Sequence, residues 1–339
     1  EAPRISASRQ FAKQLLSSLP FEMTNAQKRV SKEIVQDLKL NKPMLRLVQG
    51  DVGAGKTLVA GVAACHVLEE GWQVALMAPT EILAEQHYLN FKKWFEPLGL
   101  SVSWLSGKQK GKARAAAEQA IVDGTAHLVV GTHALFQDNV RFAKLGLVII
   151  DEQHRFGVDQ RLALRNKGAQ NMTPHQLVMT ATPIPRTLAM SAYGDLDTSV
   201  IDELPPGRTP IQTVTIPLDR REEVLQRIAS NCLEGKQAYW VCTLVEESET
   251  LDAQAAEATY LEIKERFPEL NIGLVHGKMK ADEKQAVMQQ FKANELQLLI
   301  ATTVIEVGVD VPNASIMVIE NAERLGLSQL HQLRGRVGR

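Results

Sequence analysis

The chain has few cysteines, few aromatic residues and no excess of charge of either sign. Three cysteines in 339 residues, none in a Cys-x-x-Cys pair, argue against a disulfide framework or a structural zinc site and favour a reducing compartment, the cytoplasm. The 38 basic and 39 acidic side chains give a formal net charge of −1, which excludes a basic coat dedicated to nucleic acid but not a local basic groove. No apolar run is long enough to cross a bilayer, so we expect no membrane partner.

What is present is typical of a globular α/β protein. The composition, 45% hydrophobic and 23% charged, excludes overall disorder, and the length suggests about two domains. Short apolar runs alternate with helical patterns in both halves, and continuous runs such as Leu-Val-Ile-Ile at 147–150 are typical of parallel strands buried on both faces. The expected strands are 45–49, 74–78, 128–130, 147–150, 177–180, 212–216, 239–242, 272–276, 298–301 and 316–320. The expected helices include 82–95, 113–122 and 221–233.

A proline-rich stretch separates the two halves. Residues 202–210 contain three prolines and a glycine, which interrupt both helices and strand ladders. We therefore predict a first domain over 1–203, a linker over 204–210 and a second domain over 211–339.

Residues 50–57 match the phosphate-binding pattern G-x-x-x-x-G-K-[ST] between an expected strand and a helical pattern. In such a loop the backbone N–H groups surround the β-phosphate, Lys56 reaches the β/γ oxygens and the Thr57 hydroxyl binds Mg²⁺. The alternative is a glycine-rich turn with a solvated lysine. The pattern predicts nucleotide binding without separating kinases, GTPases and motors. The predicted contacts are Gly50, Asp51, Val52, Gly53, Ala54, Gly55, Lys56 and Thr57.

A second acidic site follows the apolar run at 147–150. An acid at the carboxyl end of a parallel strand faces the crevice in which α/β sheets bind ligands. Asp151 is expected to hold Mg²⁺ through water, and Glu152 to polarise the attacking water as a base near the γ-phosphate. A solvated acidic turn is the alternative, and His154 either couples the phosphate site to its neighbours or simply packs.

These two sites belong to an ordered set of motifs that resembles helicase superfamily two. The resemblance implies two tandem RecA-like P-loop NTPase domains with parallel sheets covered by helices, and ATP with Mg²⁺ as cofactors. Longer phrases, at 77–87 and 304–312, resemble bacterial double-stranded DNA translocases that remodel stalled forks and branch-migrate Holliday junctions in recombination and repair. The further motifs lie at 78–86, 131–133, 151–154, 180–182, 301–310 and 332–339.

The resemblance also implies roles for residues outside the phosphate loop. Gln332, Arg336 and Arg339 belong to the last motif, whose arginines act as fingers on the γ-phosphate; a solvated basic helix end is the alternative. Asp310 would approach the ribose, or is an ordinary loop acid.

Gln27 has two explanations that are not exclusive. The resemblance implies that Gln27 contacts the edge of adenine while Phe21 packs on the base. Thr24 and Gln27 also have the Thr-x-x-Gln spacing of a helix capping box, which would use the same side chain structurally.

Nucleic-acid contacts are expected to be made to the backbone, because a motor steps over any sequence and phosphate contacts do not read bases. Residues 107–114 add four positive charges to a loop, which is either a phosphate-contact loop or an ordinary solvated one. For the remaining predicted contacts, the alternative to contacting nucleic acid is a purely structural role at a strand end or a helix cap. The expected contacts are Pro79, Thr80, Gly107, Thr132, His133, Thr302 and Thr303.

Relatives of this kind carry a wedge domain before the motor and a helical hairpin after its last motif, and neither is evident between Glu1 and Arg339. We expect a motor core with a shortened second domain, acting as a monomer on branched or duplex DNA. The alternatives are the motor of a transcription-repair coupling factor, an RNA helicase, and an uncoupled nucleotide-binding fragment with little turnover.

Overall fold

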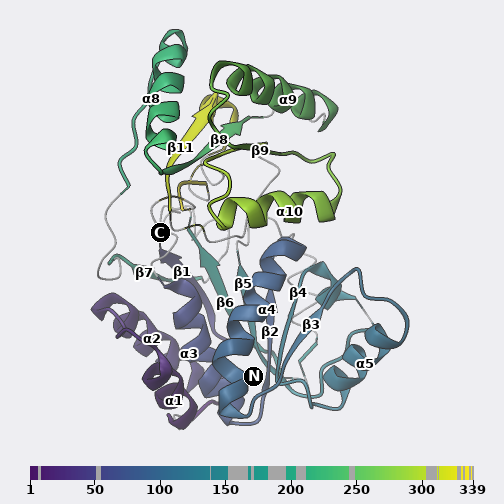
Figure 1. Ribbon diagram of the computed structural model, residues 1–339. Coiled ribbons are helices and arrows are strands. Elements are labelled where there is room, and N and C mark those ends of the chain that lie inside the picture. The colour runs from purple at the N-terminus through teal and green to yellow at the C-terminus, as the bar shows by residue number, and fades with distance from the viewer. Residues whose placement is uncertain are drawn as a thin grey trace. The chain divides into compact units, whose positions relative to one another are not determined.

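The structure is a computed structural model that divides into two compact units, Glu1–Pro205 and Pro206–Arg339, each built on a parallel sheet (Figure 1). It describes residues 1–6, 9–50, 55–137, 139–151, 167–168, 172–181, 196–203, 211–243, 249–302, 311, 313–326, 330, 333–335 and 337.

Seven of the described strands form the sheet of the first unit, in the order β3-β4-β2-β5-β6-β1-β7. Every pairing in this sheet is parallel, so all the carboxyl ends lie along one edge. The strands are β1 (Leu45–Gly50), β2 (Gln73–Met77), β3 (Val102–Leu105), β4 (Leu128–Gly131), β5 (Leu145–Asp151), β6 (His175–Thr180) and β7 (Asp197–Ile201). The helices are α1 (Gln10–Ser18), α2 (Asn25–Leu38), α3 (Lys56–Glu69), α4 (Glu81–Phe95) and α5 (Gly111–Val122).

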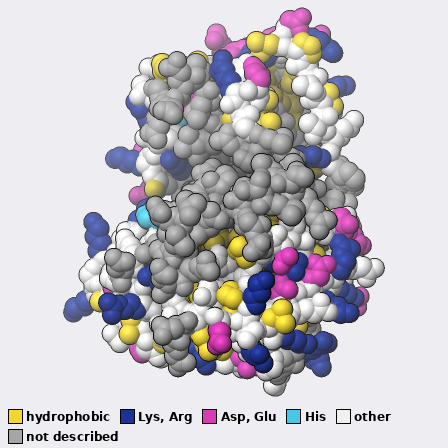
Figure 2. Space-filling view, turned by 180° about the vertical axis from the view of Figure 1, so that it is seen from behind, with side chains coloured by type: hydrophobic (Ala, Val, Ile, Leu, Met, Phe, Trp, Pro, Cys, Tyr) yellow, Lys and Arg dark blue, Asp and Glu magenta, His cyan; other side chains and the backbone are white. Residues whose placement is uncertain are grey.

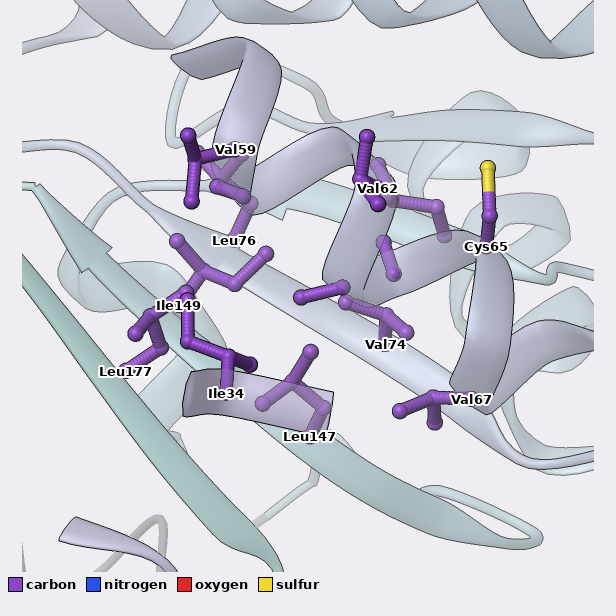
Figure 3. Packing of buried hydrophobic residues seen from close by; sticks show 14 of the residues in the cluster. Ile34, Val59, Val62, Cys65, Val67, Val74, Leu76, Leu147, Ile149 and Leu177 are labelled. Atoms are coloured by element: carbon purple, nitrogen blue, oxygen red, sulfur yellow. The ribbon is translucent and has the colours of Figure 1, made fainter. Parts of the chain in front are cut away.

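Both faces of this sheet are buried, as the continuous apolar runs predict. Leu147 and Ile149 of β5 join a core cluster with α2, α3 and α4, and Figure 3 shows them beside side chains of α3. Val148 and Ile150 alternate with them and enter the cluster on the opposite face, which includes Ile121 of α5. Burial on both faces excludes the polar alternation of a half-exposed sheet.

The second unit has a smaller sheet, in the order β11-β8-β10-β9, again with parallel pairings. The buried ring of Trp240 lies on one face and that of Phe291 on the other. Its strands are β8 (Gln237–Cys242), β9 (Ile272–Val275), β10 (Leu298–Thr302) and β11 (Ala314–Glu320), and its helices α8 (Arg221–Leu233), α9 (Glu249–Arg266) and α10 (Ala281–Lys292).

One strand prediction was wrong. Residues 212–216 have the period-two alternation of a strand, but the structure assigns them no strand, and Val214 and Ile216 are 66% and 44% exposed. Alternation alone forms no strand without a partner for its backbone groups, and no described strand pairs with this stretch. The sequence analysis also missed β3 and the polar β7. Helices α4, α5 and α8 and the other expected strands are confirmed, with each end within two residues of the expected one.

No helix among the described residues is long and apolar enough to span a membrane. On the face shown in Figure 2, Lys and Arg side chains are interspersed with Asp and Glu, in keeping with the near-zero net charge.

Candidate nucleotide site and nucleic-acid edge

Gly50, which begins the predicted phosphate loop, and Asp151, the predicted Mg²⁺ ligand, lie at one edge of the first sheet. Gly50 ends β1, Thr180 ends β6 and Asp151 ends β5. Because β6 lies between β1 and β5 and all three are parallel, these carboxyl ends are neighbours. This is the edge at which open α/β sheets bind ligands.

The described part of the phosphate loop is held by the strand before it and the helix after it. Lys56 Nζ donates to the Gly50 carbonyl oxygen at 2.6 Å, so the ammonium is already directed back across the loop. Gly55 has φ +86°, a left-handed conformation that favours glycine, and caps α3. Lys56 must exchange the Gly50 carbonyl for phosphate oxygens to act as predicted. Asp51, Val52, Gly53 and Ala54 lie outside the described residues.

Gln27 caps a helix and also reaches the phosphate loop. Gln27 N donates to Thr24 Oγ1 at 3.2 Å and Thr24 N donates to Gln27 Oε1 at 3.0 Å, so the capping box is confirmed. A Cβ atom added to Gly55 would lie 2.0 Å from Gln27 Nε2, which places the carboxamide directly against the loop. Phe21 is 52% exposed. The adenine contact therefore remains a prediction for a side chain that is already fixed beside the loop.

Sequence reasoning missed the partner of Asp151. His87 Nε2 lies 2.8 Å from Asp151 Oδ2, and both side chains are largely buried, at 12% and 15% exposure. A carboxylate accepts hydrogen bonds, so Nε2 is the protonated nitrogen in this pair. His87 closes the phrase at 77–87, but no motif spacing relates it to Asp151, 64 residues later.

The oxygen donors present fit Mg²⁺. Asp151 supplies a carboxylate and Thr57 a hydroxyl, which are hard ligands of the kind that Mg²⁺ uses alongside several waters. Among the described residues no group of three or more His, Cys, Asp or Glu side chains is arranged to hold a metal ion, which argues against an all-protein cage in that part of the chain. Glu152 and His154 lie outside the described residues.

A second part of the same edge, which we call the nucleic-acid edge, carries the five predicted nucleic-acid contacts of this unit in the loops after β2, β3 and β4. Strands β3, β4 and β2 are consecutive in the sheet, so the loops after them are neighbours. Pro79 and Thr80 follow β2, Gly107 follows β3, and Thr132 with His133 follows β4. The sequence placed these residues in separate motifs, and the strand order brings them together.

Their exposure differs. Gly107 and His133 are exposed, whereas Thr132 is 3% exposed. Thr80 Oγ1 caps α4 by accepting from Leu83 N at 3.2 Å. In this structure Gly107 and His133 are accessible to a phosphate, and the hydroxyls of Thr80 and Thr132 serve the protein itself.

The basic loop is anchored at one of its four charges. Arg114 NH1 donates to the Ser106 carbonyl at 3.0 Å, and Arg114 Nε pairs with Glu118 at 2.7 Å. Lys108, Lys110 and Lys112 are exposed. The exposed positive charge of the loop therefore comes from these three lysines.

Most of the predicted site residues of the second unit lie outside the residues that the structure describes. Thr302 ends β10 and is 1% exposed, and its hydroxyl has no hydrogen-bond partner among the described residues. Thr303, Asp310, Gln332, Arg336 and Arg339 lie outside the described residues.

Comparison with known families fits this geometry. The DEAD/DEAH box helicase model matches residues 24–191, and the model of the helicase conserved C-terminal domain matches residues 220–339. The chain belongs to the DEAD/DEAH box helicases. Its two parallel sheets are the two RecA-like domains of this family.

Within these helicases the chain is homologous to the helicase core region of RecG. It is 66% identical over 340 residues to the ATP-dependent DNA helicase RecG of Escherichia coli K12, covering 100% of this chain and 49% of that protein. The RecG of Aquifex aeolicus is 50% identical over 339 residues, 43% of its length. The chain thus spans about half the length of the curated relatives it matches, or less.

Solved structures agree. A structure of RecG bound to a three-way DNA junction has a TM-score of 0.79 and 44% identity, covering 100% of this chain and 44% of that one. Yeast Dbp5 bound to RNA and ADP BeF3, at 16% identity and a TM-score of 0.67, shares the fold.

Proposed function

We propose that this chain is the ATP-driven motor of a double-stranded DNA translocase that remodels stalled replication forks and branch-migrates Holliday junctions in recombination and repair. The observation that carries the proposal is the carboxyl edge of the first sheet. At this edge β1 leads into the phosphate loop and β5 ends at Asp151, with β6 between them, and the loops of Pro79, Gly107 and Thr132 follow other strands of the same sheet. The whole of this chain matches about half of RecG, and a structure of RecG was solved on a three-way DNA junction, which supports DNA as the partner.

We propose that each part of the chain has the role that the sequence predicts for it. Residues 1–203 bind ATP, 204–210 form a linker and 211–339 form the second motor domain. Backbone N–H groups of residues 50–55 bind the phosphates, while Gln27 and Phe21 contact the base and Asp310 the ribose. Lys56 exchanges the Gly50 carbonyl for a phosphate oxygen, which fixes the γ-phosphate for attack.

Hydrolysis needs an activated water and charge stabilisation. Glu152 orients and deprotonates the water, and Arg336 and Arg339, with Gln332 in the same motif, stabilise charge on the phosphate. Bound Mg²⁺ supplies neutralisation of the phosphate oxygens, and Thr57 and Asp151 are the residues that hold it. His87 orients Asp151 for that role through the hydrogen bond described above.

On DNA, the exposed groups at Gly107 and His133, with Pro79, Thr80 and Thr132 around them, position one strand by its phosphates. Thr302 and Thr303 do the same from the second domain. The motor acts as a monomer in the cytoplasm, at the bacterial nucleoid.

A second function is favoured by one observation. The chain spans 49% of the length of its E. coli relative, so about half of that protein is not matched by these 339 residues. If turnover depends on the unmatched half, these residues alone bind nucleotide with little turnover. A transcription-repair coupling motor is the third possibility, and only a partner assay separates it.

The test is steady-state ATP turnover with no nucleic acid, with linear duplex, with a four-way DNA junction and with single-stranded RNA. Lys56→Ala is the blank, and Lys93→Ala, an exposed lysine on α4, is the matched control. Junction-dependent turnover that survives in Lys93→Ala and disappears in Lys56→Ala supports the DNA motor. Turnover at the level of the blank, with nucleotide still bound, supports the uncoupled fragment, and stimulation by RNA alone contradicts the proposal.

A further inference from the structure

Glu81 connects all three loops of the nucleic-acid edge. Its Oε1 atom accepts from Gly107 N at 2.9 Å and from Thr132 Oγ1 at 3.3 Å. Its Oε2 atom accepts from Ser106 Oγ at 3.2 Å. Glu81 itself follows Pro79 and Thr80, so one carboxylate joins the loops after β2, β3 and β4.

The local sequence favours an acid at this place. Thr80 caps α4 with its side chain, and Glu81 lies in the first turn of the helix, where the partial positive charge of the helix N-terminus stabilises a carboxylate. A Cβ atom at Gly107 would lie 3.2 Å from Glu81 Oε1, closer than an ordinary contact, so the small residue lets the loop backbone approach the carboxylate.

Few side chains other than a carboxylate satisfy these donors together. Ser106 and Thr132 are 5% and 3% exposed, so water is largely excluded from them and their polar groups depend on partners within the protein. The two carboxylate oxygens offer about four acceptor positions and use three of them here. An amide offers one acceptor oxygen, and an apolar residue offers none.

A negative charge at this edge repels phosphate, so where the Glu81 carboxylate points indicates whether it contacts the nucleic acid or the protein. If Glu81 contacted the nucleic acid directly, it would weaken binding by charge repulsion. Its two oxygens instead face the three loops. The loop after β3 is fixed on both sides, because Arg114 NH1 holds the Ser106 carbonyl while Glu81 holds the Gly107 amide. The exposed Lys108, Lys110 and Lys112 follow directly from that fixed point.

We infer that Glu81 is a positioning residue: it holds the three loops of this edge in one arrangement that fits the phosphodiester backbone of a DNA strand, and it does not touch the DNA. The inference rests on the proposed function for the identity of the ligand. The positioning itself rests only on the contacts above.

The experiment compares Glu81→Ala and Glu81→Gln with Glu85→Ala in the full 339-residue chain. Glu85 is exposed one turn later on the same helix, so Glu85→Ala removes the same charge without disturbing the loops. The readouts are the affinity for a fluorescent three-way DNA junction by anisotropy at several salt concentrations, hydrogen exchange at the Gly107 amide, and thermal unfolding.

Glu81→Ala is expected to weaken junction binding about tenfold, because the three hydrogen bonds that hold the loops in place before binding are lost, and Glu81→Gln is expected to be intermediate. The slope of log Kd against log salt is expected to stay unchanged, because no phosphate contact is removed. The Gly107 amide is expected to exchange faster in Glu81→Ala than in Glu85→Ala.

Two results would overturn the inference. Binding in both Glu81 variants that is as tight as in Glu85→Ala would mean that the carboxylate acts only through its charge. Unchanged exchange at Gly107 in both variants would mean that it does not hold the loop. If the unsubstituted chain binds no junction, the proposed function fails, and the exchange experiment still decides the positioning. If Glu81→Ala does not fold, Glu81→Gln alone is compared with Glu85→Ala, both in junction affinity and in exchange at the Gly107 amide.

Discussion

Glu81 and His87 lie six residues apart on α4, about 9 Å along the helix axis, and each contacts a different part of the same sheet edge. Glu81 accepts from the loops of the nucleic-acid edge, and His87 reaches Asp151 at the nucleotide edge. A rigid helix thus carries one residue for each side of the site.

The hydrogen bond from His87 is expected to affect the use of Mg²⁺. His87→Ala leaves Asp151 free to rotate, so the Mg²⁺ concentration for half-maximal ATP turnover is expected to rise about tenfold. His87→Gln, whose amide N–H donates a hydrogen bond as the ring N–H does, is expected to restore part of the loss. Mg²⁺-dependent binding of a fluorescent ADP analogue provides a second readout. Equal Mg²⁺ requirements in all three proteins would show that the contact has no such role.

The two roles of Gln27 can be separated. Thr24→Ala and Gln27→Ala each remove half of the capping box, and each is expected to lower the free energy of unfolding by about 1 kcal/mol. Only Gln27→Ala removes the carboxamide beside Gly55. We expect that variant alone to lose preference for ATP over GTP, measured by competition binding. Equal nucleotide preference in the two variants would leave Gln27 as a cap.

His175 is expected to make the first unit less stable in mild acid. The ring is fully buried, Nδ1 accepts from Met44 N at 2.9 Å and Nε2 donates to the Pro3 carbonyl at 2.7 Å, so it is held neutral. Burial lowers the pKa of His175 below its usual 6.5. The unfolded chain then takes up a proton below pH 6.5 that the folded chain does not.

The sign follows from that difference. The contribution of His175 to stability is complete above pH 6.5 and declines as the pH falls, by up to about 1.4 kcal/mol per pH unit until the folded pKa is reached. Urea denaturation at pH 7.5, 6.5 and 5.5 measures it. His175→Gln is expected to be less stable at pH 7.5 and to lose less between pH 6.5 and 5.5; parallel losses in both proteins would exclude His175 as the cause.

The three cysteines are expected to be unreactive in the native protein. Cys65, Cys232 and Cys242 are buried, and burial raises the pKa of Cys65 to about 12 and those of the other two to about 11. At pH 8 their thiolate fraction is over a hundredfold below that of an exposed thiol. A disulfide reagent should label none of them in native buffer and all three in guanidinium chloride. Rapid labelling of any thiol without denaturant would contradict the burial.

The sequence predicted the parts of the fold that depend on local composition. Apolar runs such as 147–150 are buried whichever strands lie beside them, and the phosphate loop is recognised by its glycines and lysine alone. The prediction of a strand at 212–216 was wrong because a strand needs a neighbouring strand to pair with, which the alternation of apolar and polar residues does not supply. The polar β7 was missed for the converse reason, since its pairing with β1 is fixed by tertiary structure.

The contacts that organise the candidate site were beyond such patterns. Glu81 and Thr132 are 51 residues apart, and His87 and Asp151 are 64 apart. These pairs form because β2 lies between β4 and β5, a strand order that no motif spacing encodes. The motifs predicted nucleic-acid contacts at Pro79 and Thr80 but assigned no contact to the next residue, Glu81.

The position of β1 between β6 and β7 has a consequence for how the protein is made. The strand that leads into the phosphate loop ends at Gly50, but its neighbours begin only at His175 and Asp197. During synthesis, β1 can pair with β6 and β7 only after most of the first unit has emerged from the ribosome. Such non-local parallel pairing is slow and leaves apolar edges exposed meanwhile. The candidate nucleotide edge is therefore completed only after the last strand of the first unit has been made, and nascent chains that end before Ile201 are expected to require protection from aggregation.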